Sequence, residues 1–189
     1  MRILLVGAGG VGSAIVAIAA RRDFVERFVV ADHDLGRAEK AVAAVGDERC
    51  VAAHVDASDE QAVGALVAEH RCDVVLNATD PRFVMPLFRA ALAAGVDYLD
   101  MAMSLSHPHP ERPYAETGVM LGAEQFAQAR AWEAAGRLAL VGIGVEPGLS
   151  DVFARYAADH LFTEIDEIGI RDGANLVVRG EDGEPVFAP

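Results

Sequence analysis

The residues best suited to chemistry stand in the first 34 positions of this 189-residue chain. Gly7, Gly9 and Gly12 form a G-x-G-x-x-G motif between an apolar run and a segment rich in small residues. The first glycine of this motif makes a tight turn, the second lets a pyrophosphate approach the backbone, and the third allows close helix–strand contact. The helix that begins near Gly9 presents unpaired N–H groups and a partial positive charge, which favour a phosphate.

Asp32 ends a second apolar run, 20 residues after Gly12. At this distance a carboxylate reaches the ribose hydroxyls of a bound dinucleotide. We therefore predict a dinucleotide site, and the alternative is an ordinary strand–helix turn that binds nothing. The predicted contacts at the pyrophosphate and the ribose are Gly7, Gly9, Gly10, Val11, Gly12 and Asp32.

The choice of dinucleotide depends on the residues around Asp32. A carboxylate accepts hydrogen bonds from the ribose hydroxyls of NAD and repels the 2′-phosphate of NADP, so NAD is the favoured cofactor. His33 and Arg37 follow closely. NADP remains possible if the Asp32 side chain swings away from the ribose.

Alternating strands and helices must position these residues. Short runs that are hydrophobic on both faces predict buried strands, at 2–6, 28–32, 50–55, 73–78 and 96–100. Helical segments between them are long enough for parallel crossovers. We predict a doubly wound parallel α/β sheet, the Rossmann fold, with a sixth strand at 137–143 and a helix before it at 122–135.

Polar residues follow the predicted strands at their carboxyl ends, where ligands of such sheets bind. We expect Asp56 near the adenine, and Asn77 and Thr79 along the nicotinamide side. The alternatives are structural: Asp56 only ends its strand, and Asn77 and Thr79 only form a turn. Ser58, with Gln61 three residues later, predicts a capping box for the next helix.

The chain changes character after residue 150. Ser150 is predicted to cap a helix at 151–161, and alternating polar and apolar residues at 165–172 predict a half-exposed strand. We predict a dinucleotide-binding domain over residues 1–150 and an incomplete second domain over 151–189.

Composition excludes several classes of partner. The net charge of −13 argues against a nucleic-acid surface, and no apolar run approaches the ~20 residues that span a bilayer. Met1 and Arg2 lead straight into a strand, which argues against a signal peptide and predicts a cytoplasmic protein. The two cysteines lack metal or redox spacing and are expected to be buried thiols. His107 and His109 lack a third ligand, so we predict no metal site.

Four stretches, at 7–12, 77–81, 94–100 and 142–150, together resemble the saccharopine dehydrogenase family over residues 1 to about 170. The resemblance implies an oxidoreductase of amino-acid metabolism, including lysine, that acts on a C–N bond. In such enzymes hydride passes between a nicotinamide and the carbon of an imine or secondary amine. It also implies an α+β domain that closes the substrate site and forms a homodimer, so this chain resembles the amino-terminal part of a protein about twice as long.

The substrate side offers three candidate residues. Tyr98 and Asp100 lie where an amino-acid substrate would meet the nicotinamide, and Glu146 lies in a glycine-bearing turn that faces the crevice. Tyr98 is equally suited to packing, and Glu146 to a solvated position. No catalytic acid or base is assigned.

Two other functions compete with this hypothesis. A regulatory or sensor domain that binds NAD(P) without catalysis needs no turn such as 146–148. Short-chain reductases that act on C–O bonds carry a Tyr-x-x-x-Lys pair, and Lys40, the single lysine, is not preceded by such a tyrosine.

Overall fold

The computed structural model describes residues 1–171, 178–179 and 183–186. The chain divides into two compact units, Met1–Leu149 and Ser150–Pro189. None of the described helices is long and apolar enough to cross a membrane.

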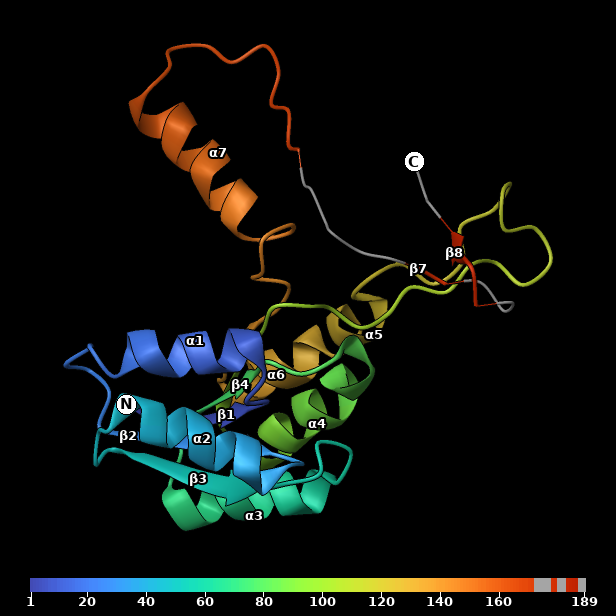
Figure 1. Ribbon diagram of the computed structural model, residues 1–189. Helices are drawn as coiled ribbons and strands as arrows, with labels where there is room; N and C mark the ends of the chain where they lie inside the picture. Colours follow the sequence, from blue (N-terminus) through green and yellow to red (C-terminus); the bar gives the residue numbers. More distant parts are fainter. Residues whose placement is uncertain (172–177, 180–182, 187–189) are drawn as a thin grey trace. The chain divides into compact units, whose positions relative to one another are not determined.

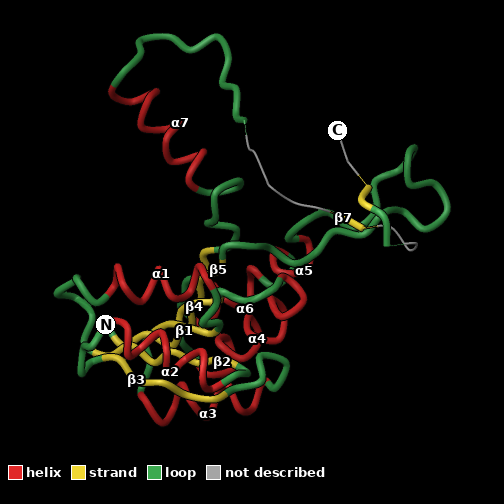
Figure 2. Tube along the Cα trace, viewed as in Figure 1, coloured by secondary structure: helices red, strands yellow, loops and turns green. Residues whose placement is uncertain are grey.

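A six-stranded sheet forms the centre of the first unit (Figures 1 and 2). Its strand order is β3-β2-β1-β4-β5-β6, and every neighbouring pair is parallel. This is the order of a doubly wound Rossmann sheet, which confirms the predicted fold. The strands are β1 (Arg2–Val6), β2 (Arg27–Asp32), β3 (Cys50–His54), β4 (Val74–Asn77), β5 (Asp97–Asp100) and β6 (Ala139–Leu140).

Helices cover both faces of this sheet because successive strand residues point to opposite sides. Ile3 and Leu5 pack with Val16 and Ala38 on the side of α1 and α2, whereas Leu4 packs with residues of α3, α4 and α6 on the other side. The helices are α1 (Gly10–Ala19), α2 (Leu35–Val45), α3 (Glu60–His70), α4 (Val84–Ala94), α5 (Ala123–Phe126) and α6 (Ala129–Ala135), with a 3-10 turn, η1 (Pro81–Phe83), before α4.

Local capping explains where several helices begin and end. The Asp34 side chain accepts a hydrogen bond from Gly36 N at 2.9 Å, and Gly46 ends α2 in the left-handed conformation. The predicted capping box is wrong, because Asp59 caps α3 through Gln61 N and Ala62 N.

Two predicted elements of the first unit are shorter than expected. Only Ala139–Leu140 of the segment 137–143 pairs with β5, because the chain turns away at Gly142, which has φ +69°. The helix predicted at 122–135 is interrupted between α5 and α6.

The helix α7 (Leu149–His160) begins at the last residue of the first unit and otherwise belongs to the second, which also contains a short antiparallel pair, β7 (Val178–Arg179) and β8 (Pro185–Val186). Ser150 lies inside α7 and does not cap it, since its Oγ has no hydrogen-bond partner in the part of the chain that the structure describes. Residues 165–171 form no strand, because no described segment pairs with them, and residue 172 lies outside the described residues.

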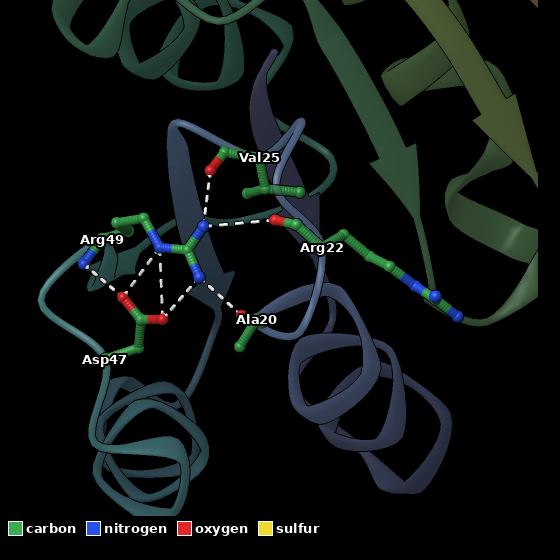
Figure 3. Close-up of polar contacts among 5 residues, drawn as sticks. All are labelled: Ala20, Arg22, Val25, Asp47 and Arg49. Atoms are coloured by element: carbon green, nitrogen blue, oxygen red, sulfur yellow. Dashed lines mark hydrogen bonds and ion pairs between the residues drawn. The ribbon is translucent and has the colours of Figure 1, made fainter.

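The side chain of Arg49 connects the segment after α1 to the loop before β3 (Figure 3). The Arg49 guanidinium forms an ion pair with Asp47 and donates hydrogen bonds to the backbone carbonyls of Ala20, Arg22 and Val25. The hydrogen bonds and charge of Arg49 lower the pKa of Asp47 to about 2. Arg49 therefore ties the backbone that follows α1 to the loop before β3.

We predict that Arg49→Met lowers the melting temperature by several degrees, because three backbone carbonyls and the Asp47 carboxylate lose the hydrogen bonds of the guanidinium. The matched control is Arg21→Met, since Arg21 has no side-chain hydrogen bond or ion pair among the described residues. In the wild type, the contribution of Asp47 to stability is present above pH 3.8 and is lost as the pH falls towards 2. Carboxyl NMR titration should show the pKa of Asp47 rising in Arg49→Met only. Equal melting temperatures for the two variants would contradict this role.

Candidate functional site

A cavity of about 530 Å³ opens at the carboxyl ends of β1, β2, β3 and β4. The strands β1 and β4 are neighbours at the centre of the sheet, and the strand order runs in opposite directions on either side of them. Doubly wound sheets bind ligands at this point, outside the carboxyl ends of the strands. The cavity is lined by Val6, Gly7, Gly9, Asp32, His33, Arg37, Val55, Asp56, Ala57, Ser58, Ala78, Thr79, Asp80 and Phe83.

The glycine loop is shaped by two close backbone approaches. Gly7 has φ +104°, and a Cβ there would lie 2.5 Å from the carbonyl oxygen of Ala78, just after the neighbouring strand β4. A Cβ on Gly12 would overlap the carbonyl oxygen of Gly7. Both positions therefore require glycine for the packing of the protein itself, with or without a ligand.

Gly9 differs from these two glycines. Its φ is −70°, which any residue adopts, and nothing lies within 4 Å of the position that a Cβ would take. No described residue accepts a hydrogen bond from the backbone N–H groups of Gly10, Val11 or Gly12 in the first turn of α1. Open space in front of unpaired N–H groups at a helix N-terminus fits a pyrophosphate.

Asp32 stands at the end of β2 with both carboxylate oxygens held by backbone. Oδ2 accepts a hydrogen bond from Ala8 N at 2.7 Å, and Oδ1 accepts one from Asp34 N at 2.9 Å. The carboxylate is thus tied to the glycine loop and still faces the cavity. The exposed side chains of His33 and Arg37 line the same cavity, so an acidic and a basic group stand side by side at the expected ribose position.

Asp56 also lines the cavity, after the end of β3. Its Oδ1 accepts hydrogen bonds from Ser58 Oγ at 2.7 Å and Ser58 N at 2.8 Å, and these bonds lower the pKa of the carboxyl. The Ser58 hydroxyl is therefore used to hold Asp56 and does not cap α3. Asp56 is both a strand-end turn former and a wall of the cavity.

Asn77 is the last residue of β4 and Thr79 follows just after it, and the two side chains differ in their exposure to the cavity. Thr79 lines the cavity, whereas the side chain of Asn77 is 3% exposed and does not. The Asn77 Oδ1 accepts hydrogen bonds from Thr79 N at 2.9 Å and Thr79 Oγ1 at 2.7 Å. Asn77 therefore stands behind the cavity wall and holds Thr79 in it.

The substrate-side candidates do not reach this cavity. Tyr98 is 1% exposed and Asp100 is fully buried, because α4, α5 and α6 cover this part of the sheet. Tyr98 packs edge-on against Phe88 at 5.2 Å between ring centroids, and burial raises the pKa of its hydroxyl. Glu146 is exposed in the turn after β6 and does not line the cavity described above. The structure thus brings the cofactor candidates together and leaves these three residues apart from them.

A buried polar network surrounds Asp100. Its Oδ1 accepts a hydrogen bond from Gly142 N and its Oδ2 accepts one from Gln125 Nε2, both at 2.7 Å. Gln125 Oε1 in turn accepts Ser104 N at 2.9 Å. Burial raises the pKa of Asp100, and these hydrogen bonds oppose that rise. Gln125 carries no sequence signal for this role, since it is one polar residue in a short helical segment.

Comparison with known proteins identifies the family of this chain. Residues 3–140 match the family described as "Saccharopine dehydrogenase NADP binding domain". The chain belongs to this family. The predicted resemblance is thereby confirmed, and the saccharopine dehydrogenase NADP binding domain occupies most of the first unit.

Three relatives illustrate the family. The chain is 33% identical to carboxynorspermidine synthase of Vibrio alginolyticus over 183 residues, 91% of this chain and 43% of that protein. It is 32% identical to carboxyaminopropylagmatine dehydrogenase of Synechocystis, over 90% of this chain and 41% of that protein. Saccharopine dehydrogenase (L-Glu forming) of Saccharomyces cerevisiae shares the fold, with a TM-score of 0.62 at 20% identity, over 85% of this chain and 31% of that one. The chain therefore spans less than half the length of the curated relatives it matches.

The glycine loop predicts opposite effects for two alanine substitutions. Gly12→Ala should destabilise the protein by about 2–3 kcal/mol, because the new Cβ overlaps the Gly7 carbonyl. Gly9→Ala should change stability by about 1 kcal/mol or less, because its Cβ enters open space. Urea unfolding of both variants measures the difference, and comparable losses for the two would refute this assignment.

The Asp100 network predicts a rescue. Asp100→Asn should cost about 2–3 kcal/mol of stability. Gly142 N can only donate, so the oxygen of the new side chain must stay beside it, and the new amino group then faces the amino group of Gln125. Adding Gln125→Glu restores an acceptor that serves both the new amide at position 100 and Ser104 N. Asp100→Asn with Gln125→Glu should therefore recover most of the lost stability in chemical unfolding. A double variant no more stable than Asp100→Asn alone would argue against the network.

Proposed function

We propose that this chain is the cofactor-binding part of an NAD(P)-dependent oxidoreductase that acts on a C–N bond of an amino-acid-like substrate. The observation that carries the proposal is the fit of the cavity to a dinucleotide: open space at Gly9, three unpaired N–H groups and a carboxylate at the ribose position. Membership of the saccharopine dehydrogenase family supports the reaction type. The relatives named carboxynorspermidine synthase and carboxyaminopropylagmatine dehydrogenase support a carboxylated amine as substrate.

In this proposal the cofactor supplies hydride transfer, and the residues of this chain bind and orient it. The N–H groups of Gly10, Val11 and Gly12 bind the pyrophosphate. Asp32 accepts the ribose hydroxyls, and Asp56 closes the adenine end of the cavity. The backbone held by Asn77 and the side chain of Thr79 form the wall beside the nicotinamide.

NAD is the favoured cofactor of the proposal. Both oxygens of Asp32 are held in place by backbone N–H groups, so the side chain is not free to swing from the ribose. The carboxylate would face a 2′-phosphate directly. Arg37 lines the cavity with a side chain that is 66% exposed and lies 3.8 Å from the exposed carboxylate of Asp34. In this proposal Arg37 is the cation that binds a 2′-phosphate once the Asp32 carboxylate is removed.

In this proposal, most of the substrate site and the homodimer contacts belong to a longer protein. The chain covers 43% of the carboxynorspermidine synthase that it matches. Residues 151–189 are interpreted as the beginning of a substrate and dimerisation domain. Glu146, exposed in the turn after β6, is the candidate proton carrier that this chain contributes to the substrate side.

We predict that the wild-type chain binds NADH more tightly than NADPH, and that Asp32→Ser reverses this order. Removing the carboxylate should improve the NADPH-to-NADH affinity ratio by at least about tenfold, because charge repulsion is lost and Arg37 remains. Fluorescence titration with each reduced nucleotide measures the ratio. Arg37→Met in the Asp32→Ser background should abolish the gain.

Two results would overturn the proposal. The first is a wild-type chain that binds neither nucleotide, and the second is a folded Gly9→Ala variant that binds NADH as tightly as the wild type. Unchanged nucleotide preference in Asp32→Ser would leave the dinucleotide site in place and remove Asp32 from the ribose.

A further inference from the structure

Thr79 is held in the cavity wall by the side chain of Asn77, and its hydroxyl also lies 3.4 Å from the carbonyl oxygen of Asp80. Its backbone N–H and its hydroxyl both donate to Asn77 Oδ1, at 2.9 Å and 2.7 Å. Since a backbone N–H can only donate, the oxygen of the Asn77 amide must face Thr79. The orientation of this amide therefore decides where Thr79 stands.

The amino group of the same amide points into the core. Asn77 Nδ2 donates to the Tyr98 hydroxyl at 3.0 Å, and both side chains are at most 3% exposed. The neighbouring strands bring the pair together, since Val75 of β4 lies opposite Tyr98 of β5 and Asn77 lies opposite Asp100. Without an acceptor at this point the amino group would be buried and unpaired.

The Tyr98 hydroxyl is itself fixed from two sides. It lies 3.5 Å from the carbonyl oxygen of Val84 at the start of α4, and it interacts with the Asp100 carboxylate. Its ring packs in a cluster with Phe88 and Trp132, with centroids 5.2 Å and 6.3 Å away, and those two rings also contact each other. A carbonyl and a carboxylate can only accept, so they take the hydroxyl proton and leave the Tyr98 oxygen to accept from Asn77 Nδ2. The hydroxyl therefore favours the same orientation of the Asn77 amide that Thr79 N requires.

We propose that Tyr98 is a positioning residue for the cofactor site: its hydroxyl orients Asn77, and Asn77 holds Thr79 against the bound dinucleotide. Tyr98 acts through the side chains in front of it and touches no ligand. The expected effect of Tyr98 on dinucleotide binding rests on the proposed function. Its expected effect on Thr79 in the nucleotide-free protein rests on the hydrogen bonds alone.

The test compares Tyr98→Phe with Phe88→Leu in the 189-residue chain. Tyr98→Phe keeps the ring and removes only the hydroxyl, whereas Phe88→Leu disturbs the same aromatic cluster without touching Asn77. Tyr98→Phe should weaken NADH binding by roughly fivefold to tenfold, the effect of one lost buried hydrogen bond. It should also speed hydrogen exchange at the Thr79 amide by a similar factor in the nucleotide-free protein. Phe88→Leu should lower the melting temperature and leave both quantities unchanged.

The two readouts separate the possible failures. If the wild type binds no dinucleotide, the proposed function fails and Thr79 exchange still decides the role of Tyr98. If Tyr98→Phe lowers the melting temperature as Phe88→Leu does, and leaves NADH affinity and Thr79 exchange unchanged, Tyr98 is a packing residue and the inference is wrong.

Discussion

The close approach of Gly12 to the carbonyl of Gly7 is the constraint on which the site depends. It lets α1 begin directly above the end of β1, so that the first N–H groups of the helix point over the cavity. Gly7 in turn lies against the backbone of Ala78, just after β4. The loop is therefore confined by two strands and one helix, and the room in front of Gly9 is a consequence of that confinement.

The two sides of the cavity are held by different means. On the ribose and adenine side, Asp32 and Asp56 are fixed by backbone N–H groups and by Ser58 within short turns that reach the solvent. On the other side, Asn77 is the outermost member of a buried network. Removing one partner from such a network leaves an unpaired group in a low dielectric. The first side can therefore change its ligand preference at small structural cost, while the second resists substitution.

The buried network also explains why some polar residues at the strand ends do not line the cavity: they form hydrogen bonds inside the protein instead. Asp100 joins β5 to Gln125 of α5 and to the turn at Gly142, which are distant in the chain. Its hydrogen bonds keep those segments at the edge of the sheet beyond β5. The family match supports the proposal that this unit binds the cofactor. The chain spans 43% of the carboxynorspermidine synthase that it matches, and the proposal places the remaining parts of the substrate site outside this chain.

The sequence by itself determined β1 to β5, the helices between them and the glycine loop, because these follow from local patterns. Runs that are apolar on both faces, caps such as Asp34 and glycines such as Gly46 act within a few residues of themselves. Only the tertiary structure decided that Asp100 is buried, that β6 is two residues long and that Gln125 is the partner of Asp100. The physical reason is distance along the chain: Gln125 and Asp100 are 25 residues apart, and no local pattern reports which distant segment covers a side chain.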